Sequence, residues 1–356
     1  MLQTKIIKLD PNDPQEEYLH KAADILREGG LVIIPTETVY GIAANRQNRR
    51  AVDKLAEIKK RPKEKVFSLH IAQKERVEDF ASGIPVSAYK LIDKFWPGPL
   101  TLVLKSIDGQ GSVGIRMPDD KIALRVIDLS GVDVVCPSAN ISGNPPPINF
   151  QEAIRDFKGL VDFAIDAGST RVRIESSVVD FTTDPFKVLR EGAIKRSDIE
   201  SAAKKKTVLF ICTGNSCRSV MAQAIFEKKL KDKGIKDVEV LSAGTMLFGG
   251  LGATLEVKEL LAEEGMDVSK HISQKVTRDM LNKSDIILVM EHFHEERILQ
   301  LDPQVKNRLF LLKEFAKAGA DDNNMDISDP IGKPKEFYVR TMDTIKQAIE
   351  RISEII

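Results

Sequence analysis

Residues 207–219, with the sequence TVLFICTGNSCRS, constrain the fold of this chain more than any other stretch. The apolar run from Val208 to Ile211 predicts a buried strand, and the apolar residues after Ser219 recur at the three-and-four spacing of a helix. A tight loop between a strand and a helix directs backbone N–H groups and the positive end of the helix dipole toward one point, where an anion is stabilised. The stretch therefore predicts an α/β unit with an anion-binding loop.

The loop carries the residue types that phosphoryl chemistry needs. A thiol at a helix N-terminus, such as that of Cys212, is favoured in its nucleophilic thiolate form. Arg218, at C-x5-R spacing, can hold two phosphate oxygens with one guanidinium. A bare C-x5-R also arises by chance, as a buried cysteine beside a solvated arginine. Gly214 and Asn215, which tolerate positive φ, and the flanking strand and helix favour a phosphatase loop instead.

The segment CTGNSCRS resembles the phosphate loop of the low-molecular-weight protein tyrosine phosphatase family. The resemblance implies that Cys212 is the nucleophile of a phosphocysteine mechanism and that Arg218 binds the phosphoryl group. Asp329, in the segment SDPIG, matches the family's general acid, although an Asp-Pro pair on a loop is most often only a turn. The residues that the resemblance assigns to the support of the loop are Gly214, Asn215, Cys217 and Ser219.

The substrate of such a loop depends on the residues around it. The small Ser216 and the Ile331-Gly332 pair resemble the protein-arginine phosphatase branch, whereas tyrosine-specific members have bulkier or aromatic residues there. A small hydroxyl leaves room for a guanidinium, so we favour phosphoarginine over phosphotyrosine. An arsenate reductase would need two further cysteines downstream, and none follows Cys217. Cys217 itself can form a reversible disulfide that protects Cys212 from over-oxidation.

A second set of motifs runs through residues 1–200. It consists of PTETVYG at 35–41, KKRPKEK at 59–65, His70, WPGPLT at 96–101, GSVGIRMP at 111–118, PSAN at 137–140, ESSVVD at 175–180 and LREG at 189–192. Alone, a basic run is usually a solvated helix end, and a single strand histidine is usually structural. In this order, the motifs resemble the YrdC-like family of threonylcarbamoyl-adenylate synthases.

That resemblance implies the synthesis of threonylcarbamoyl-AMP and pyrophosphate from ATP, bicarbonate and L-threonine, with Mg²⁺ expected to accompany the ATP. Adenylyl transfer needs mainly cations on the phosphates and a positioned nucleophile, which these residues can supply. The implied ATP-binding residues are Lys59, Arg61, Lys65, Ser112, Asn140 and Arg190. The implied threonine-binding residues are Thr38, His70, Arg116, Ser138 and Ser176, with Arg116 as the natural partner of the carboxylate.

Some segments depart from the family or only imitate a motif. The segment MPDD at 117–120 lacks the histidine that often follows the arginine in the family, and Ile148 stands where a threonine is common. The segment GQGSVG at 109–114 spells a dinucleotide fingerprint but precedes an extended, proline-broken stretch rather than a helix, so we reject it. The segment HEERI at 294–298 has isoleucine in place of the second histidine of a zinc motif, so it predicts no metal site.

The length of 356 residues suits two domains, each able to bury a core. We place the boundary in the polar stretch 201–206, with a YrdC-like domain at 1–203 and a phosphatase domain at 204–356. The predicted fold class is α/β: a twisted mixed sheet in the first domain and a flavodoxin-like four-stranded parallel sheet with helices on both faces in the second. Lys plus Arg and Asp plus Glu are both 53, so no global field attracts nucleic acid.

The chain shows no signal core and no apolar run of membrane-spanning length, and its three cysteines do not form a disulfide framework. We therefore expect a cytoplasmic protein. The two resemblances imply an enzyme that feeds a downstream tRNA threonylcarbamoyl-transferase and acts on a phosphoprotein. Direct tRNA binding is left open. One alternative is that the first domain is an RNA-binding module. Another is that the second domain is a non-catalytic scaffold or an arsenate-reductase-like relative.

Overall fold

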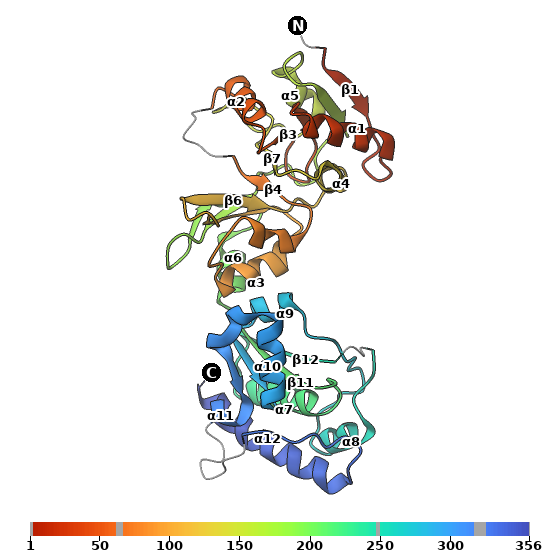
Figure 1. The fold of residues 1–356 in the computed structure, drawn as a ribbon, viewed down its shortest axis with the longest axis vertical. Helices are drawn as coiled ribbons and strands as arrows, with labels where there is room; N and C mark the ends of the chain where they lie inside the picture. The colour runs from red at the N-terminus through yellow and green to blue at the C-terminus, as the bar shows by residue number, and fades with distance from the viewer. Residues whose placement is uncertain (1–2, 62–66, 247–249, 317–324, 356) are drawn as a thin grey trace. The chain divides into compact units, whose positions relative to one another are not determined.

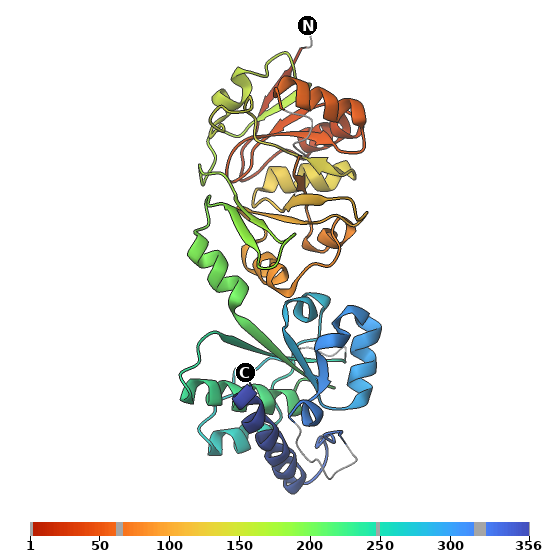
Figure 2. The ribbon, with the colours of Figure 1, turned by 90° about the vertical axis from the view of Figure 1, so that its left-hand side faces the viewer.

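The computed structural model describes residues 3–61, 67–246, 250–316 and 325–355. The chain divides into two compact units, residues 1–203 and residues 204–356. Both are α/β units, as the ribbons in Figures 1 and 2 show, and each is described separately below.

The N-terminal unit is built on one mixed sheet. Its strands are β1 (Lys5–Lys8), β2 (Val32–Ile34), β3 (Gly41–Asn45), β4 (Leu69–His70), β5 (Leu100–Lys105), β6 (Ser112–Arg116), β7 (Val134–Val135), β8 (Phe163–Asp166), β9 (Ser177–Asp180) and β10 (Lys187–Arg190). Its helices are α1 (Glu16–Arg27), α2 (Arg49–Ile58), the 3-10 helix η1 (Lys74–Asp79), α3 (Val86–Phe95), α4 (Lys121–Ser130), α5 (Phe150–Arg155) and α6 (Arg196–Lys204).

The sheet of this unit has the order β1-β8-β2-β3-β7-β4-β6-β5-β9-β10 over the described residues. It mixes parallel pairs, such as β4 with β6, and antiparallel pairs, such as β5 with β6. Two cores cover its faces because successive side chains of a strand point to opposite sides. Leu31 and Ile33 join the core with α2, α3 and α6, whereas Val32 and Ile34 join the core with α1 and α4.

The C-terminal unit has a smaller, all-parallel sheet. Its strands are β11 (Lys206–Cys212), β12 (Val238–Gly244), β13 (Ile286–Val289) and β14 (Leu309–Leu311). Its helices are α7 (Arg218–Asp232), α8 (Leu255–Glu263), α9 (Arg278–Lys283), α10 (His292–Leu301), the 3-10 helix η2 (Pro303–Arg308), α11 (Leu312–Phe315) and α12 (Lys335–Ile355).

The order β12-β11-β13-β14 makes β11 a central strand, paired in parallel with β12 and β13. Phe210 and Cys212 of β11 belong to the core that includes residues of α7, α8 and α12, and Leu209 and Ile211 belong to the core that includes residues of α9 and α10. Helices thus cover both faces of a four-stranded parallel sheet. The fold class predicted from the sequence is confirmed for both units.

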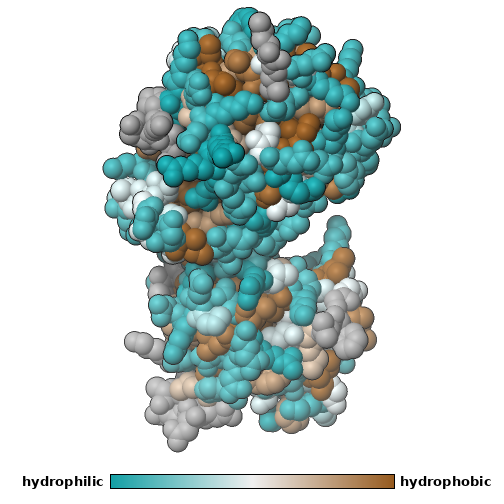
Figure 3. Space-filling model, turned by 45° about the horizontal axis from the view of Figure 1, so that its top comes forward, coloured by the Kyte–Doolittle hydropathy of each residue, from teal (hydrophilic) through white to brown (hydrophobic). Residues whose placement is uncertain are grey.

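Most of the predicted boundary stretch is regular secondary structure. α6 continues to Lys204 and β11 begins at Lys206, so Lys205 alone lies between them. The helix buries Ile199, Ala202 and Ala203 and exposes its charged residues, so the polar composition marks a helix surface. On the face drawn in Figure 3, hydrophilic side chains cover most of the described surface.

Candidate active sites

The loop between β11 and α7 holds Cys212 at the carboxyl end of the central strand. The Cys212 side chain is buried, and its Sγ lies 3.0 Å from Ser219 Oγ. Asn215 fixes the loop from within: its Nδ2 donates to Ser219 Oγ at 3.0 Å and to Ser242 Oγ at 2.9 Å. Its Oδ1 accepts from the backbone N of Gln274 at 2.9 Å. The Asn215 amide thus orders the loop and the Ser219 hydroxyl, which lies beside the Cys212 sulfur in the first turn of α7.

Glycine is needed where β12 meets this loop. A Cβ on Gly244 would lie 2.8 Å from the backbone O of Thr213 and 3.0 Å from the backbone N of Asn215, so any side chain there would displace the loop. Within the loop, the left-handed conformation belongs to Asn215, with φ +50°, and not to Gly214. An asparagine tolerates this conformation better than other side chains do.

Arg218, the first residue of α7, is fully buried and bound on several sides. Its Nη1 donates to Glu291 Oε2 at 2.6 Å and to the backbone O of Ile327 at 2.7 Å. Its Nη2 donates to Thr213 Oγ1 at 2.9 Å and to Asp329 Oδ2 at 2.5 Å. The Nε is buried and has no hydrogen-bond partner in the described part of the chain. One guanidinium N–H therefore remains for an oxygen that the protein does not provide.

The general-acid candidate is adjacent to this arginine. Asp329 lies 117 residues after Cys212 in the chain, yet its carboxylate pairs with the Arg218 guanidinium. The backbone N of Ile327 donates to the O of Met290 at 2.7 Å, which ties the segment before Asp329 to the end of β13. The fold thus brings Asp329 to Arg218, which belongs to the same loop as Cys212.

The two remaining loop residues lie on the side of α8. The backbone N of Thr254 donates to the O of Ser216 at 3.1 Å, and Cys217 Sγ lies 3.6 Å from Thr254 Oγ1. Burial raises the pKa of Cys217 above the ordinary value of a thiol. Cys212 and Cys217 are both free thiols. The protective disulfide between them stays a prediction.

Several contributors to this site were not predicted from the sequence. They are Thr213, Ser242, Gly244, His271, Glu291 and His294. His271 Nε2 lies 2.7 Å from the backbone O of Asn215, and His294 Nε2 lies 2.9 Å from Thr213 Oγ1. Glu291 directly follows Met290, at the carboxyl end of β13, where the edge of a parallel sheet collects functional residues. That position is the only sequence signal that could have indicated it.

The second site is a cavity of about 180 Å³ in the N-terminal unit. Its lining is rich in hydroxyl groups and in arginine, and it contains most of the predicted residues. Those predicted residues are Arg61, His70, Arg116, Ser138, Ser176 and Arg190. Thr38 does not line the cavity, but its Oγ1 accepts a hydrogen bond from Arg116 Nη2 at 2.8 Å. Lys59, Ser112 and Asn140 do not line the cavity either.

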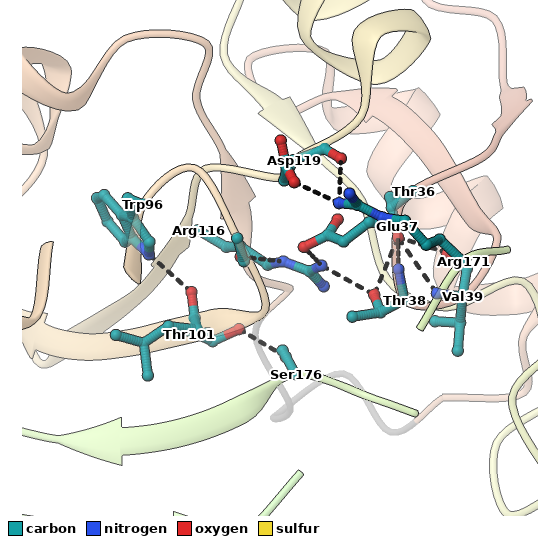
Figure 4. A network of polar contacts seen from close by, with 12 residues as sticks. Thr36, Glu37, Thr38, Val39, Trp96, Thr101, Arg116, Asp119, Arg171 and Ser176 are labelled. Carbon is teal, nitrogen blue, oxygen red and sulfur yellow. Dashed lines mark hydrogen bonds and ion pairs between the residues drawn. The ribbon is translucent and has the colours of Figure 1, made fainter. Parts of the chain in front are cut away.

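Arg116, at the end of β6, is held by a buried network (Figure 4). Its Nη2 lies 2.7 Å from Glu37 Oε1 and 2.8 Å from Thr38 Oγ1, and its Nε donates to the backbone O of Gly98 at 3.3 Å. Only 1% of the Glu37 side chain and 6% of the Arg116 side chain are exposed. The Arg116 Nη1 nitrogen has no hydrogen bond to the residues that the structure describes. The guanidinium is therefore held through Nε and Nη2.

Lys59 lies outside the cavity. Its side chain is 2% exposed, and its ammonium donates to the backbone O of Ser138 and, at 2.6 Å, to the backbone O of Asn140. The backbone O of Lys59 also accepts from the N of Ser142 at 2.9 Å. Burial, and secondarily the charge of Arg61, lower the pKa of Lys59 to about 8. The lysine thus anchors the loop that carries two predicted substrate ligands.

The other predicted residues are distributed around the cavity. Ser138 Oγ and Asn140 Oδ1 form a 2.5 Å hydrogen bond, and Asn140 Nδ2 donates to the backbone O of Asn144. Arg190 pairs with Glu175 at 2.7 Å, and its Nε donates to the backbone O of Ser176. The Ser176 hydroxyl also lies 2.9 Å from Thr101 Oγ1, as Figure 4 shows.

Two predicted ATP ligands are not in this cluster. Ser112 begins β6, the strand that Arg116 ends, and it lines a separate depression with Lys105 and Thr182. Lys65 lies outside the described residues.

Burial shapes the electrostatics of this region. It lowers the pKa of His70 to about 3, with a further contribution from Arg116, so the imidazole is neutral at physiological pH. Burial also raises the pKa of Asp120 to about 6, and the negative charge of Glu37 raises it further. The hydrogen bond that the Asp120 carboxylate accepts from the N of Ala123, as the N-cap of α4, acts in the opposite direction. Asp119, beside it, pairs with Arg171 (Figure 4).

Two family models match the chain. The Sua5/YciO/YrdC model, described as "Telomere recombination", matches residues 24–192. The model "Low molecular weight phosphotyrosine protein phosphatase" matches residues 207–356. A protein-arginine-phosphatase from Geobacillus stearothermophilus is 35% identical over 147 residues, covering 41% of this chain and 93% of that relative. The solved structure of a P. abyssi Sua5 variant is 31% identical to this chain in sequence and matches it with a TM-score of 0.54. The match covers 74% of this chain and 90% of the variant.

The chain therefore belongs to the Sua5/YciO/YrdC family through its N-terminal unit and to the low-molecular-weight phosphotyrosine phosphatase family through its C-terminal unit. A threonylcarbamoyl-AMP synthase from Pyrococcus abyssi is 42% identical over 194 residues, which is 52% of this chain and 57% of that relative. P. abyssi Sua5 complexed with L-threonine is a structural match at 29% identity and a TM-score of 0.54, covering 86% of this chain and 99% of that one. The chain spans less than three fifths of the first curated relatives' length.

No helix in the described parts of the chain is both long and apolar enough to cross a membrane. Within the same parts, no cluster of three or more histidine, cysteine, aspartate or glutamate side chains is arranged to hold a metal ion.

Proposed function

We propose that the chain is a bifunctional enzyme, a threonylcarbamoyl-AMP synthase joined to a cysteine-dependent protein phosphatase. The synthase would convert ATP, bicarbonate and L-threonine into threonylcarbamoyl-AMP and pyrophosphate, for threonylcarbamoyladenosine modification of tRNA. The phosphatase would act on a phosphoprotein. The single observation that carries the phosphatase half is the pairing of Asp329, from a distant segment, with Arg218 of the loop that holds the buried Cys212 beside Ser219.

For the synthase, the lining of the N-terminal cavity supports the assignment. Arg61 and Arg190 would hold the phosphates of ATP, because Arg forms fork-shaped pairs with phosphate oxygens. Arg116 lines the cavity and would hold the threonine carboxylate through Nη1, the nitrogen for which the described residues provide no acceptor. Hydroxyl groups of Ser138 and Ser176 would bind the polar end of threonine.

We assign Lys59 a positioning role in this reaction rather than a contact with ATP. Its ammonium is used by two backbone carbonyls of the 138–140 loop, and it does not line the cavity. Asn140, Ser112 and Lys65 remain proposed ATP ligands. Mg²⁺ is expected with the triphosphate; it commonly binds through phosphates and retains water, so it needs no protein cage. The described residues form no such cage.

For the phosphatase, the reaction follows from the arrangement of three groups. The Cys212 thiolate attacks phosphorus, and the bond from phosphorus to the leaving atom breaks as the P–Cys212 bond forms. Asp329, which must first take up a proton and release Arg218, gives that proton to the leaving atom. Asp329 then takes a proton from the water that hydrolyses the phosphocysteine. Arg218 stabilises the equatorial oxygens with its buried Nε–H and with the Nη2–H that Asp329 occupies in the free enzyme. The Ser219 hydroxyl stabilises the thiolate as it leaves.

We favour phosphoarginine as the substrate. The small Ser216 lines the loop at a position where a bulkier residue would narrow the entrance, and the similarity to a protein-arginine-phosphatase supports the same choice. The proposed partners are the phosphoprotein and the downstream tRNA threonylcarbamoyl-transferase, in the cytoplasm.

Two assays test these proposals against the rival functions. The synthase predicts pyrophosphate release that requires ATP, bicarbonate and threonine together, whereas an RNA-binding module would release none. The phosphatase predicts hydrolysis of an aryl phosphate that Cys212→Ser abolishes, whereas a scaffold would show no activity in either form. Comparison of phosphoarginine with phosphotyrosine peptides of the same sequence decides the substrate.

A further inference from the structure

His294 is a fully buried histidine with no assigned role. It lies in the first turn of α10, and its ring is completely shielded from solvent. The Nε2 atom lies 2.9 Å from Thr213 Oγ1 and 3.8 Å from Glu291 Oε2. The Nδ1 atom is buried and has no hydrogen-bond partner in the described part of the chain. A buried histidine with one bonded and one unbonded nitrogen restricts the protons that it can carry.

The two groups that His294 approaches are two of the four that accept hydrogen bonds from Arg218. Thr213 Oγ1 accepts from Arg218 Nη2 at 2.9 Å, and Glu291 Oε2 accepts from Nη1 at 2.6 Å. A guanidinium can only donate, so one lone pair of the Thr213 oxygen is committed to the arginine. The His294 imidazole therefore contacts the Thr213 hydroxyl and lies near the Glu291 carboxylate, both of which orient the Arg218 guanidinium.

The unbonded Nδ1 decides between the two neutral tautomers. If Nδ1 carried the proton, a buried N–H donor would have no acceptor, which native proteins rarely tolerate. If Nε2 carries it, the N–H donates to Thr213 Oγ1 and lies near the Glu291 carboxylate, and only an imidazole lone pair is left without a partner. The environment thus favours the Nε2–H tautomer.

The charge of the ring is equally constrained. Burial, and secondarily the charge of Arg218, lower the pKa of His294 to about 4. The other charged groups that influence the ring are Glu291, Arg297, Asp326 and Asp329. The net effect is a neutral imidazole at physiological pH, which donates a hydrogen bond without repelling the arginine behind which it packs.

We infer that His294 is a positioning residue of the phosphatase site, whose Nε2–H fixes the Thr213 hydroxyl so that this oxygen holds Arg218 in line with the phosphate loop. This inference rests on the proposed phosphatase function. With both lone pairs of Thr213 Oγ1 occupied, by His294 and by Arg218, the hydroxyl cannot rotate away. Without the imidazole, the threonine is free to change rotamer, and Nη2 loses one of its two fixed acceptors.

Glutamine is the decisive substitution, because its amide nitrogen can replace Nε2–H, whereas leucine fills the space without a donor. We expect His294→Leu to lower kcat/KM for an aryl phosphate about 30-fold, the scale of a lost hydrogen bond near a charged group. The inhibition constant of inorganic phosphate should rise by a similar factor. His294→Gln should stay within about threefold of the parent enzyme, and Thr213→Val should match His294→Leu with no further loss in the double variant. His292→Gln is the matched control, since that ring is exposed and pairs with Asp326.

A ¹⁵N NMR spectrum of the unmodified protein tests the tautomer directly, and it should show protonation at Nε2 of His294. A signal from Nδ1–H would overturn the inference, as would a His294→Leu variant that loses thermal stability but retains kcat/KM within threefold. A glutamine variant as impaired as the leucine variant would also overturn it. If the parent enzyme hydrolyses no aryl phosphate, the proposed function fails, whereas phosphate binding measured by calorimetry and the NMR spectrum still decide the role of His294.

Discussion

The buried pair between Glu37 and Arg116 gives the sharpest stability prediction. Replacing Glu37 by leucine leaves the Arg116 guanidinium buried without its counter-charge, because Thr38 and Gly98 offer only neutral acceptors. Breaking one partner of such a pair costs about 3–5 kcal/mol of unfolding free energy. With a urea dependence of about 2 kcal/mol per molar, the unfolding midpoint of the N-terminal unit should fall by about 2 M.

The chain contains its own probe for this experiment. Trp96 is the single tryptophan, and it is buried with its Nε1 donating to the backbone O of Leu100 at 2.8 Å. It lies two residues from Gly98, whose carbonyl accepts from Arg116. Tryptophan fluorescence during a urea titration therefore reports unfolding of the N-terminal unit alone, in the segment that contacts the pair.

A double-mutant cycle separates the ion pair from simple packing. The combination of Glu37→Leu with Arg116→Met removes both charges, and exchange of a buried pair for apolar residues is often nearly neutral. The double variant should therefore be more stable than either single variant. A loss below about 1 kcal/mol for Glu37→Leu, or a double variant whose loss equals the sum of both singles, would refute the reasoning.

Three further predictions concern single groups. The pKa of Asp120 is raised in the folded state, from 3.8 to about 6, so its stabilising contribution is complete below about pH 4 and is lost as the pH rises through 6. Asp120→Asn keeps the helix cap and should raise the unfolding free energy of the N-terminal unit at pH 8 by up to about 3 kcal/mol. Below about pH 4 the variant and the parent protein should be equally stable in urea titrations followed by tryptophan fluorescence. Lys59→Met should raise KM for both ATP and threonine in the pyrophosphate assay; a rise for ATP alone would indicate a direct contact instead. Asp329→Asn should lower kcat for an aryl phosphate about 100-fold or more while inorganic phosphate binds Arg218 more tightly, because a carboxylate no longer competes for Nη2; weaker phosphate binding would contradict the free-state ion pair.

Local pattern was sufficient where one segment determines its own structure. The strand before Cys212, the helix after it and the C-terminal helix follow from periodicity, and their apolar faces bury as that periodicity predicts. The parallel sheet follows from the alternation of strands and helices. Composition alone does not show that α6 continues to Lys204, because a short amphipathic helix and a polar linker have similar composition when only three helix residues are buried.

The site was predictable only as far as motifs reach. Cys212, Arg218 and Asp329 are recognisable by spacing or by a neighbouring proline. The partners that orient them come from segments far apart in the sequence, such as His294 and Thr213, which are separated by 81 residues. No periodicity or propensity encodes such a pair, since it depends on how two loops meet at the sheet edge. Lys59 shows the same limit, because the sequence gives its charge but not the carbonyls that use it.

The alternation along β11 has a consequence for how the two halves of the gene product can be re-engineered. Phe210 and Cys212 face one core and Leu209 and Ile211 the other, so a one-residue insertion within the strand would exchange the two sets and turn the nucleophile to the wrong side. Lys205, the exposed residue between α6 and β11, carries no such constraint. Spacers that vary the tether between the two catalytic units therefore belong at that residue, upstream of the strand.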